Sequence, residues 1–374
     1  MLSNLKVLEL ASVLAGPSVG QFFAELGAEV IKVENLKTRG DITRTWKSAG
    51  EETDNRSAYF CSVNWGKKSI AVDLTSPEGK SIVQKLAAKA DIIIASYKPG
   101  DAEKLGVAYQ QLTTTNQQLL YGQITGYGSD NDRVGYDAVL QAESGFMDLN
   151  GEKNRPPTKM PIALIDVLAA HQLKEGLLLA LLNRERTGKG CLVEVSLLET
   201  AISSLVNQAS NWLVANKLPT RQGSLHPNIA PYGESFETAD GKRVLLAIGS
   251  DRQFKDLCEI LELSPDVKFS TNQLRVEHRK ALSILLEPSI QKWNSQELMT
   301  QIHRKKIPAG IIQNVKEALE MPGIENTFLN AGGLKGIRTF IANFSESPSR
   351  ESGNNLLPPP HFGEHTNEIL KALG

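Results

Sequence analysis

Short apolar runs alternate with helix-like segments through the first two hundred residues, and this alternation restricts the fold more than any other feature. Runs of strand length stand at 7–10, 30–33, 69–73, 91–96 and 120–124. Between them, Pro17 to Leu26 and Ser76 to Ala90 have helical patterns with a proline near the first turn, which is typical of helix starts. An order of strand, helix and strand predicts a parallel sheet with helices on both faces.

The carboxyl ends of the predicted strands are the expected place for a ligand. In open parallel sheets the ligand binds in the crevice beyond these ends. We therefore expect binding residues in the loops that follow Val33, Asp73, Ser96 and Ile124.

The length of 374 residues predicts about two domains. Near Pro219 the pattern becomes rich in turn residues, and Asp240-Gly241 between two strand-like runs predicts a hairpin. The serine-rich stretch from Asn343 to Asn355 is expected to be a surface loop. We predict a large α/β domain of residues 1–219, a smaller α+β domain of residues 220–328, and a return segment of residues 329–374 that completes the large domain.

Composition excludes several classes of protein. The net charge of −1 gives no support to nucleic acid or an anionic membrane as partner. No apolar stretch approaches the roughly 18 residues of a membrane span, and Met1 to Leu10 lacks the basic region of a signal peptide. Three dispersed cysteines and six histidines without ligand spacing predict neither disulfides nor a metal site. We therefore expect a cytoplasmic protein without a metal.

Two long apolar helices are predicted in succession, at 166–186 and 197–216. Apolar residues surround most of the circumference of each. A helix of this kind is normally buried, so we expect the pair to form a domain centre or the core of a dimer.

Asp166 stands at the expected start of the first of these helices. A carboxylate there lies in the field of the positive helix end and beside free backbone N–H groups. These groups would hold it ionised, which suits a nucleophile that attacks a carbonyl carbon. Capping is the alternative, because aspartate is also a favoured N-cap residue.

Familiar nucleotide and hydrolase motifs are missing. Residues 14–20, after the first strand, lack the G-x-G-x-x-G pattern of dinucleotide-binding proteins, so we predict neither a nicotinamide nor a flavin cofactor. Residues 186–190 are glycine-rich but follow a helix, which favours a glycine C-cap over a phosphate loop. No G-x-S-x-G elbow supports a serine hydrolase.

A set of short motifs, in order over nearly the whole chain, resembles the class III CoA-transferases, the group of formyl-CoA transferase and crotonobetainyl-CoA transferase. Each motif is weak alone, but together they are specific. They are residues 10–17 and 26–34, Gly40-Asp41, residues 64–69 and 72–74, Pro99-Gly100, Leu105-Gly106, Gly126-Tyr127-Gly128, Gly135-Tyr136-Asp137, and residues 184–190, 226–233, 307–310 and 363–366.

This resemblance implies a Rossmann-like large domain, a small domain, and two ring-like chains interlocked as a homodimer. The residue that matches the family nucleophile is Asp166. The implied reaction moves CoA from an acyl-CoA thioester to a carboxylic acid through an aspartyl anhydride and an aspartyl-CoA thioester. Each step develops an oxyanion, so backbone N–H donors near Asp166 should matter.

The resemblance also implies contacts with CoA in the strand-end loops. The matching positions are Leu14, Ala15, Asn35, Asp73, Leu74, Thr75, Ser96, Tyr97, Lys98, Lys104, Thr125, Gly126, Tyr127 and Gly128. Tyr97 would stack on the adenine ring, and Lys98 and Lys104 would meet phosphates as point charges. Apart from the resemblance, exposed lysines and a tyrosine at a core edge are more often structural.

Several positions depart from the formyl-CoA transferases, which have Gln at Leu14, Arg near Asn35, Asn at Ser96 and Lys at Thr125. The glycine-rich active-site loop of that group is reduced to Gly249-Ser250. A leucine in place of a hydrogen-bonding glutamine changes what an acyl pocket accepts. We therefore expect an acid larger or less polar than formate or oxalate.

Two rival functions stay open. An α-methylacyl-CoA racemase of the same fold needs an acid and a base on opposite faces of the α-carbon. The racemases carry His where Tyr136 stands here, and a tyrosine with a pKa of about 10 is a poor base at neutral pH. The other rival is a CoA-binding protein without catalysis, suggested by the replaced contact residues.

Overall fold

The computed structural model describes residues 1–264, 266–345 and 356–374. By its internal contacts the chain divides into two units. The first comprises Met1–Phe146, Lys159–Lys217 and Gly323–Gly374, and the second Met147–Thr158 and Leu218–Pro322. Most of the predicted surface loop from Asn343 to Asn355 lies outside the described residues.

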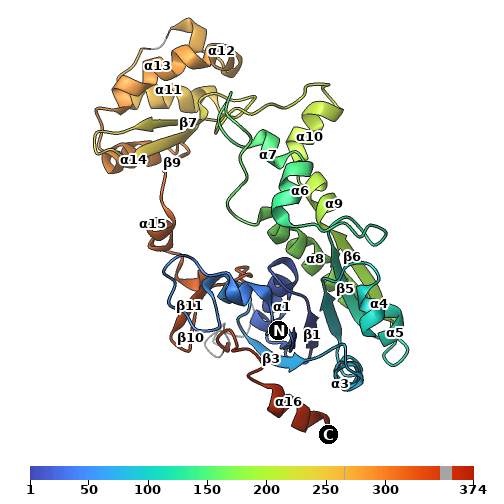
Figure 1. The fold of residues 1–374 in the computed structure, drawn as a ribbon. Coiled ribbons are helices and arrows are strands. Elements are labelled where there is room, and N and C mark those ends of the chain that lie inside the picture. Colours follow the sequence, from blue (N-terminus) through green and yellow to red (C-terminus); the bar gives the residue numbers. More distant parts are fainter. Residues whose placement is uncertain (265, 346–355) are drawn as a thin grey trace. The chain divides into compact units, whose positions relative to one another are not determined.

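A six-stranded parallel sheet forms the centre of the first unit (Figure 1) and confirms the predicted parallel sheet. Its strands are β1 (Lys6–Leu10), β2 (Glu29–Asn35), β3 (Lys67–Val72), β4 (Ile92–Ala95), β5 (Leu120–Thr125) and β6 (Cys191–Ser196). They lie in the order β3-β2-β1-β4-β5-β6. Strands β2 and β3 lie on one side of β1, and strands β4, β5 and β6 follow on its other side. A crevice therefore opens beyond the carboxyl ends of β1 and β4.

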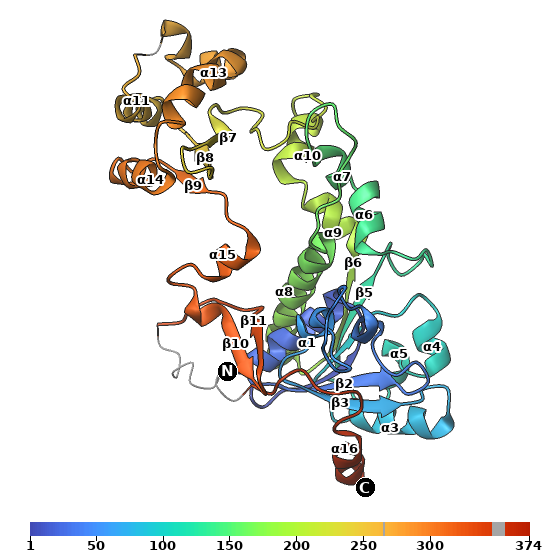
Figure 2. The ribbon, with the colours of Figure 1, turned by 60° about the vertical axis from the view of Figure 1, so that its left-hand side comes forward.

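Helices cover both faces of this sheet (Figure 2). Helices α1 (Ala15–Glu25) and α8 (Leu164–Thr187) cover one face, and α3 (Pro77–Ala87), α4 (Asp101–Leu105), α5 (Tyr109–Leu112) and α16 (Thr366–Leu373) cover the other. Neighbouring strand residues point to opposite faces. Val7 packs in the cluster with α1 and α8, whereas Leu8 packs in the cluster with α3. Burial on both faces explains why the strands read as continuous apolar runs.

The remaining elements of the first unit lie in its connections. They are the 3-10 turn η1 (Ile42–Thr45), the helices α2 (Ala58–Cys61), α6 (Asp137–Glu143), α9 (Leu197–Ser203) and α10 (Val206–Leu213), the turn η3 (Glu325–Thr327), and the hairpin of β10 (Phe328–Ala331) with β11 (Leu334–Ile337). Helix α7 (Phe146–Leu149) begins at the end of a first-unit segment. No helix among the described residues is both long and apolar enough to cross a bilayer.

The predicted single helix at 197–216 is wrong, because the chain breaks between α9 and α10. The hydroxyl groups of Ser203 and Ser204 donate to the carbonyl of Thr200 at 3.0 and 2.7 Å. Such local bonds compete with helix continuation. Val206 then adopts a positive φ of 45°, which a β-branched residue rarely does.

The expected burial differs between the two helices. On one side of α8, Ile165, Leu173 and Leu177 are fully buried in the core of the first unit, as expected. Leu179 and Leu182 on α8 are 67% and 65% exposed, and Leu213 near the end of α10 is 76% exposed. Helix α10 has no buried residue. The expected domain centre is therefore confirmed for one side of α8 and wrong for α10, and the core of a dimer stays a prediction.

The second unit contains a three-stranded antiparallel sheet of β7 (Tyr232–Glu237), β8 (Arg243–Ala247) and β9 (Ala309–Ile311). The pairing of β7 with β8 confirms the hairpin predicted at Asp240-Gly241. The sheet shares a buried cluster with the helices around it. These are α11 (Asp251–Ile260), α12 (Asn272–Glu277), α13 (Arg279–Ile290) and α14 (Ser295–Arg304), with η2 (Val267–Phe269); α15 (Val315–Leu319) follows.

Residues 147–158 belong to the second unit, although the predicted boundary places them in the large domain. Arg221 donates to the carbonyls of Asp148 and Arg155, and the N–H of Gly223 donates to the carbonyl of Gly151 at 2.9 Å. These bonds join two segments that are far apart in the sequence. The boundaries at 219 and 328 stay predictions for folding domains.

Candidate active site

Asp166 is the third residue of helix α8 and lines a cavity of about 200 Å³ with only 8% of its surface exposed. It does not cap the helix. Ala163 occupies the N-cap position and offers no side-chain cap. Instead, Asp137 at the start of α6 accepts the N–H of Ile165 at 2.7 Å. The capping alternative for Asp166 is therefore wrong, and its carboxylate is free for chemistry.

The protonation of Asp166 also differs from the expectation that helix N–H groups hold it ionised. Burial, and to a smaller degree the nearby charge of Asp137, raises the pKa of Asp166 to about 7. No donor among the described residues bonds to its carboxylate. A carboxylate that is ionised at neutral pH but poorly solvated is a strong nucleophile.

Loops at the carboxyl ends of β1, β4 and β5 form most of the cavity wall. The predicted residues that the structure brings together here are Leu14, Ala15, Ser96, Tyr97, Lys98, Thr125, Gly126, Tyr136 and Asp166. They come from distant parts of the sequence, as expected where parallel strands end at one sheet edge.

Two glycines let the loop of residues 126–136 fold back onto the end of β5. A Cβ atom on Gly135 would lie 2.6 Å from the Cα of Gly126, and one on Gly126 would lie 2.9 Å from the Cα of Gly135. Only glycine tolerates so close a backbone approach. This contact brings Tyr136 to the cavity that Asp166 lines.

A second cavity, of about 250 Å³, shares Tyr97, Lys98 and Thr125 with the first. Tyr97 packs at the edge of the buried cluster under α3 and α4, and burial raises its pKa to about 12. The Tyr97 ring is therefore held in place while its edge is open to both cavities. The shared residues make the two cavities neighbours along the carboxyl edge of the sheet.

Other predicted CoA contacts line neither cavity. They are Asn35, Asp73, Leu74, Thr75, Lys104, Tyr127 and Gly128. The Nζ of Lys37, a residue outside the prediction, lies 2.6 Å from the Thr75 hydroxyl and 3.2 Å from Asp73. Lys104 pairs with Asp101 at 3.0 Å. The Gly128 N–H donates to the Thr125 hydroxyl at 3.0 Å, which closes the turn after β5.

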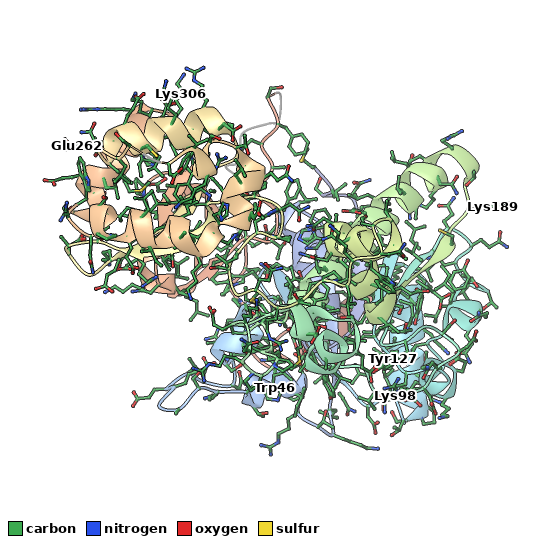
Figure 3. The ribbon with its side chains drawn as sticks, turned by 90° about the horizontal axis from the view of Figure 1, so that it is seen from above. Trp46, Lys98, Tyr127, Lys189, Glu262 and Lys306 are labelled. Atoms are coloured by element: carbon green, nitrogen blue, oxygen red, sulfur yellow. The ribbon has the colours of Figure 1, made fainter. Side chains whose placement is uncertain are left out.

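Arg133 is a cavity residue that sequence reasoning missed. Its guanidinium lies 4.2 Å from the centre of the Tyr127 ring and pairs with Glu143 at 2.5 Å. The Tyr127 hydroxyl donates to the same Glu143 at 2.9 Å. Figure 3 shows Tyr127 and Lys98 at the surface of the first unit. Lys98 and Arg133 are the two cations among the described residues of the cavity wall.

Tyr59 in α2 is a second neighbour that the sequence did not indicate. Burial, together with the charges of Asp166, Asp137 and Asp41, raises the pKa of Tyr59 to about 12. Its ring contacts Trp46 at 5.1 Å between centres. Tyr59 therefore keeps its proton and is a neutral hydroxyl beside three carboxylates.

Gly249 and Ser250, the predicted remnant of the active-site loop, belong to the second unit. Ser250 is the N-cap of α11 and accepts the N–H of Gln253 at 3.2 Å. The N–H of Gly249 donates to the Gln253 side chain at 3.0 Å. These bonds show that the two residues cap helix α11. A contact between these residues and the substrate stays a prediction.

Comparison with known proteins gives a consistent result. Residues 2–366 match the profile of CoA-transferase family III. The chain is 36% identical to succinate–glutarate CoA-transferase from Agrobacterium fabrum, over all of this chain and 95% of that protein. It is 34% identical to human succinyl-CoA:glutarate CoA-transferase, over all of this chain and 86% of that protein. A CaiB/BaiF family protein from Brucella suis has a similar crystal structure, with a TM-score of 0.88, 37% identity, and coverage of 100% and 99%.

Proposed function

We propose that this chain, which belongs to CoA-transferase family III and is therefore an enzyme, moves CoA from one dicarboxylic acid to another through covalent intermediates on Asp166. The observation that carries this proposal is the buried, unbonded carboxylate of Asp166 in the cavity at the sheet edge. Its raised pKa marks a group tuned for chemistry rather than for structure.

The proposed reaction begins when a carboxylate oxygen of Asp166 attacks the thioester carbon of the donor. The C–S bond breaks, CoA leaves as a thiolate, and a mixed anhydride forms. The thiolate then attacks the side-chain carbonyl carbon of Asp166, which releases the donor acid and leaves an aspartyl-CoA thioester. The acceptor carboxylate attacks that carbon and expels the thiolate, which finally attacks the acceptor's acyl carbon and restores Asp166.

Each attack turns a carbonyl oxygen into an oxyanion that needs donors. Helix α1 begins at the cavity wall with Ala15 and Gly16. Among the described residues no acceptor binds the N–H groups of these two residues. Free N–H groups at a helix start favour negative charge. We assign the stabilisation of the oxyanion to them.

The substrate class rests on the cavity and on the relatives. The two relatives are named for succinate and glutarate, which are dicarboxylates of four and five carbons. An acyl group of this kind keeps one free carboxylate while the other is a thioester. Arg133 in the cavity wall offers a guanidinium that matches a carboxylate. We propose that it binds the free carboxylate, and that Lys98 binds a phosphate of CoA.

The interlocked homodimer of ring-like, Rossmann-like chains that the family resemblance implies is part of this proposal. Leu179 and Leu182 on α8, and Leu213 on α10, are large apolar side chains that are exposed in the single chain. Clustered exposed apolar side chains are typical of interaction sites. A second copy of the chain would cover them.

Mass spectrometry of the intact protein after mixing with succinyl-CoA tests the proposed function. We expect an adduct that hydroxylamine removes, and its absence in the Asp166→Asn variant. Transfer of CoA to glutarate should appear in the same reaction. Solvent deuterium uptake at the α-carbon of a 2-methylacyl-CoA, without an adduct, would support a racemase instead. Binding of CoA without either reaction would support a non-catalytic protein.

A further inference from the structure

The turn between β1 and α1 is held in a strained conformation. Val13 has a φ of 73°, which is unfavourable for a β-branched residue and persists only where the surroundings enforce it. Residues 12–16 of this turn line the cavity beside Asp166. They lead directly into Ala15 and Gly16, whose N–H groups are the proposed oxyanion donors.

Two buried charged side chains hold the turn by hydrogen bonds to its backbone. The carboxylate of Asp41 accepts the N–H of Val13 at 3.2 and 3.3 Å. The ammonium of Lys32 donates to the carbonyl of Ala11 at 2.8 Å. Lys32 and Asp41 pair with each other at 3.0 Å, and both side chains are 1% exposed. The backbone groups on both sides of Ser12 are therefore bound to one ion pair.

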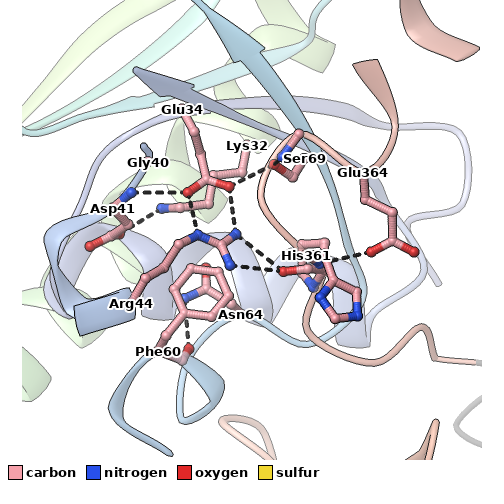
Figure 4. Close-up of polar contacts among 12 residues, drawn as sticks. Lys32, Glu34, Gly40, Asp41, Arg44, Phe60, Asn64, Ser69, His361 and Glu364 are labelled. Carbon is pink, nitrogen blue, oxygen red and sulfur yellow. Dashed lines mark hydrogen bonds and ion pairs between the residues drawn. The ribbon is translucent and has the colours of Figure 1, made fainter. Parts of the chain in front are cut away.

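A wider network holds this pair from three strands. Glu9 on β1 pairs with Lys32 at 2.9 Å and with Lys67 on β3 at 2.7 Å. Lys67 donates to the carbonyl of Pro17 in the first turn of α1 at 2.9 Å. Glu34 accepts the backbone N–H of Asp41 at 2.9 Å and pairs with Arg44 at 2.6 Å (Figure 4). Every charge in the network has a partner of opposite sign.

Stability alone is a poor reason for such a network. A buried ion pair often stabilises a protein no more than apolar residues of the same volume would. These charges also fix the position of the backbone, because three of their hydrogen bonds go to backbone groups of Ala11, Val13 and Pro17. Ala11 and Pro17 flank the segment that lines the cavity, and Val13 lies within it.

We propose that Asp41, held by Lys32, is a positioning residue that keeps the β1–α1 turn in its left-handed form and so aims the N–H groups of Ala15 and Gly16 at the reacting carbonyl of the substrate. This inference rests on the proposed function for its catalytic consequence. It does not require Asp41 to touch the substrate. Its effect should appear in the rate of the covalent step rather than in the binding of CoA.

The Asp41→Asn variant tests this role. The ion pair with Lys32 is lost, and only one of the two oxygen atoms that accept the Val13 N–H remains, so the hydrogen bond to Val13 is weakened. Asp91→Asn is a matched control, because Asp91 also accepts a backbone N–H, that of Lys6 at 2.9 Å, and pairs with Arg184 at 3.1 Å. Asp91 acts on the amino end of β1, away from the cavity. We expect Asp41→Asn to slow adduct formation in single turnover at least tenfold, with less than a threefold change in the Kd of CoA, and Asp91→Asn to change neither.

A double-mutant cycle with Val13→Gly distinguishes a loss of the turn conformation at Val13 from a general destabilisation of the protein. Glycine adopts a positive φ without strain, so it should restore several-fold of the rate in the Asp41→Asn background. It should restore nothing in the Asp91→Asn background. Additive effects of Asp41→Asn and Val13→Gly would overturn the proposal, as would equal slowing by the two asparagine variants.

Hydrogen exchange of the backbone N–H of Val13 gives a readout that needs no activity. We expect exchange at Val13 to accelerate more than tenfold in Asp41→Asn and to stay unchanged in Asp91→Asn. Unchanged exchange in Asp41→Asn would refute the proposal that Asp41 holds the turn at Val13, even if the rate of adduct formation fell. A wild-type protein that forms no adduct would refute the proposed function, and the exchange result alone would then test whether Asp41 holds the turn.

Discussion

Asp137 takes the place of the missing N-cap of helix α8 through the N–H of Ile165, and its charge thereby acts on Asp166. The same carboxylate is anchored by Gln141, which donates to it at 2.7 Å. One side chain thus stabilises the helix that carries Asp166, the proposed nucleophile, and raises the pKa of Asp166. This arrangement links the fold of the site to its pH dependence.

Activity should rise with pH through about 7. Asp166 attacks only when it is ionised, and burial with the Asp137 charge raises its pKa to about 7. Tyr59, with a pKa of about 12, stays neutral over this range. The pH profile of kcat/KM measures the midpoint. In Asp137→Asn, which removes a negative charge, the midpoint should move to lower pH. A flat profile from pH 5 to 9 would contradict this account.

Replacing Asp166 with asparagine should stabilise the protein above neutral pH. The folded-state pKa of about 7 lies above the usual value of 3.8, so folding favours the protonated form and stability falls as pH rises between these values. Asp166→Asn avoids that loss, which is at most about 4 kcal/mol. We expect a higher Tm than wild type at pH 8 and an equal Tm at pH 4. Equal Tm values at both pH values would show that the carboxylate is better solvated than the structure indicates.

Loss of Arg133 should weaken the binding of dicarboxylates more than the binding of monocarboxylates. In Arg133→Met we expect KM for succinate or glutarate to rise about tenfold, since a charge-assisted hydrogen bond contributes about 1.5–3 kcal/mol. KM for a monocarboxylate acceptor should change little. Steady-state kinetics with acceptor pairs of equal chain length measure the difference. Arg252→Met, which removes an exposed arginine from α11 in the second unit, is the control. A uniform rise for both acceptors would assign Arg133 to CoA binding instead.

A charge on the open surface of α8 should break the proposed homodimer. Leu182→Asp places a carboxylate among exposed apolar side chains, where burial by a second copy would be unfavourable. Light scattering after size exclusion should give the mass of one chain for this variant and of two for wild type. The matched control is Ile284→Asp, because Ile284 on α13 is 64% exposed. A monomeric wild type would contradict the prediction.

Local patterns in the sequence determined the order of the strands of the sheet and placed Asp166 in the first turn of a long helix. The strand at 91–96 and the helix that contains Asp166 follow from apolar runs and from period, which depend on residues close together in the chain. The break after Ser204 escaped this reasoning because hydroxyl bonds to Thr200 compete with a helical pattern that is otherwise continuous.

Only the tertiary structure decided the properties of the site. The pKa of Asp166 depends on burial and on Asp137, which is 29 positions away, and the turn at Val13 depends on Asp41 from the segment after β2. The periodicity of apolar residues along the chain does not indicate which distant residues will be paired in this way. Electrostatic and hydrogen-bond energies depend on distance in space and on exclusion of water, and both quantities exist only once the strands of the sheet lie side by side.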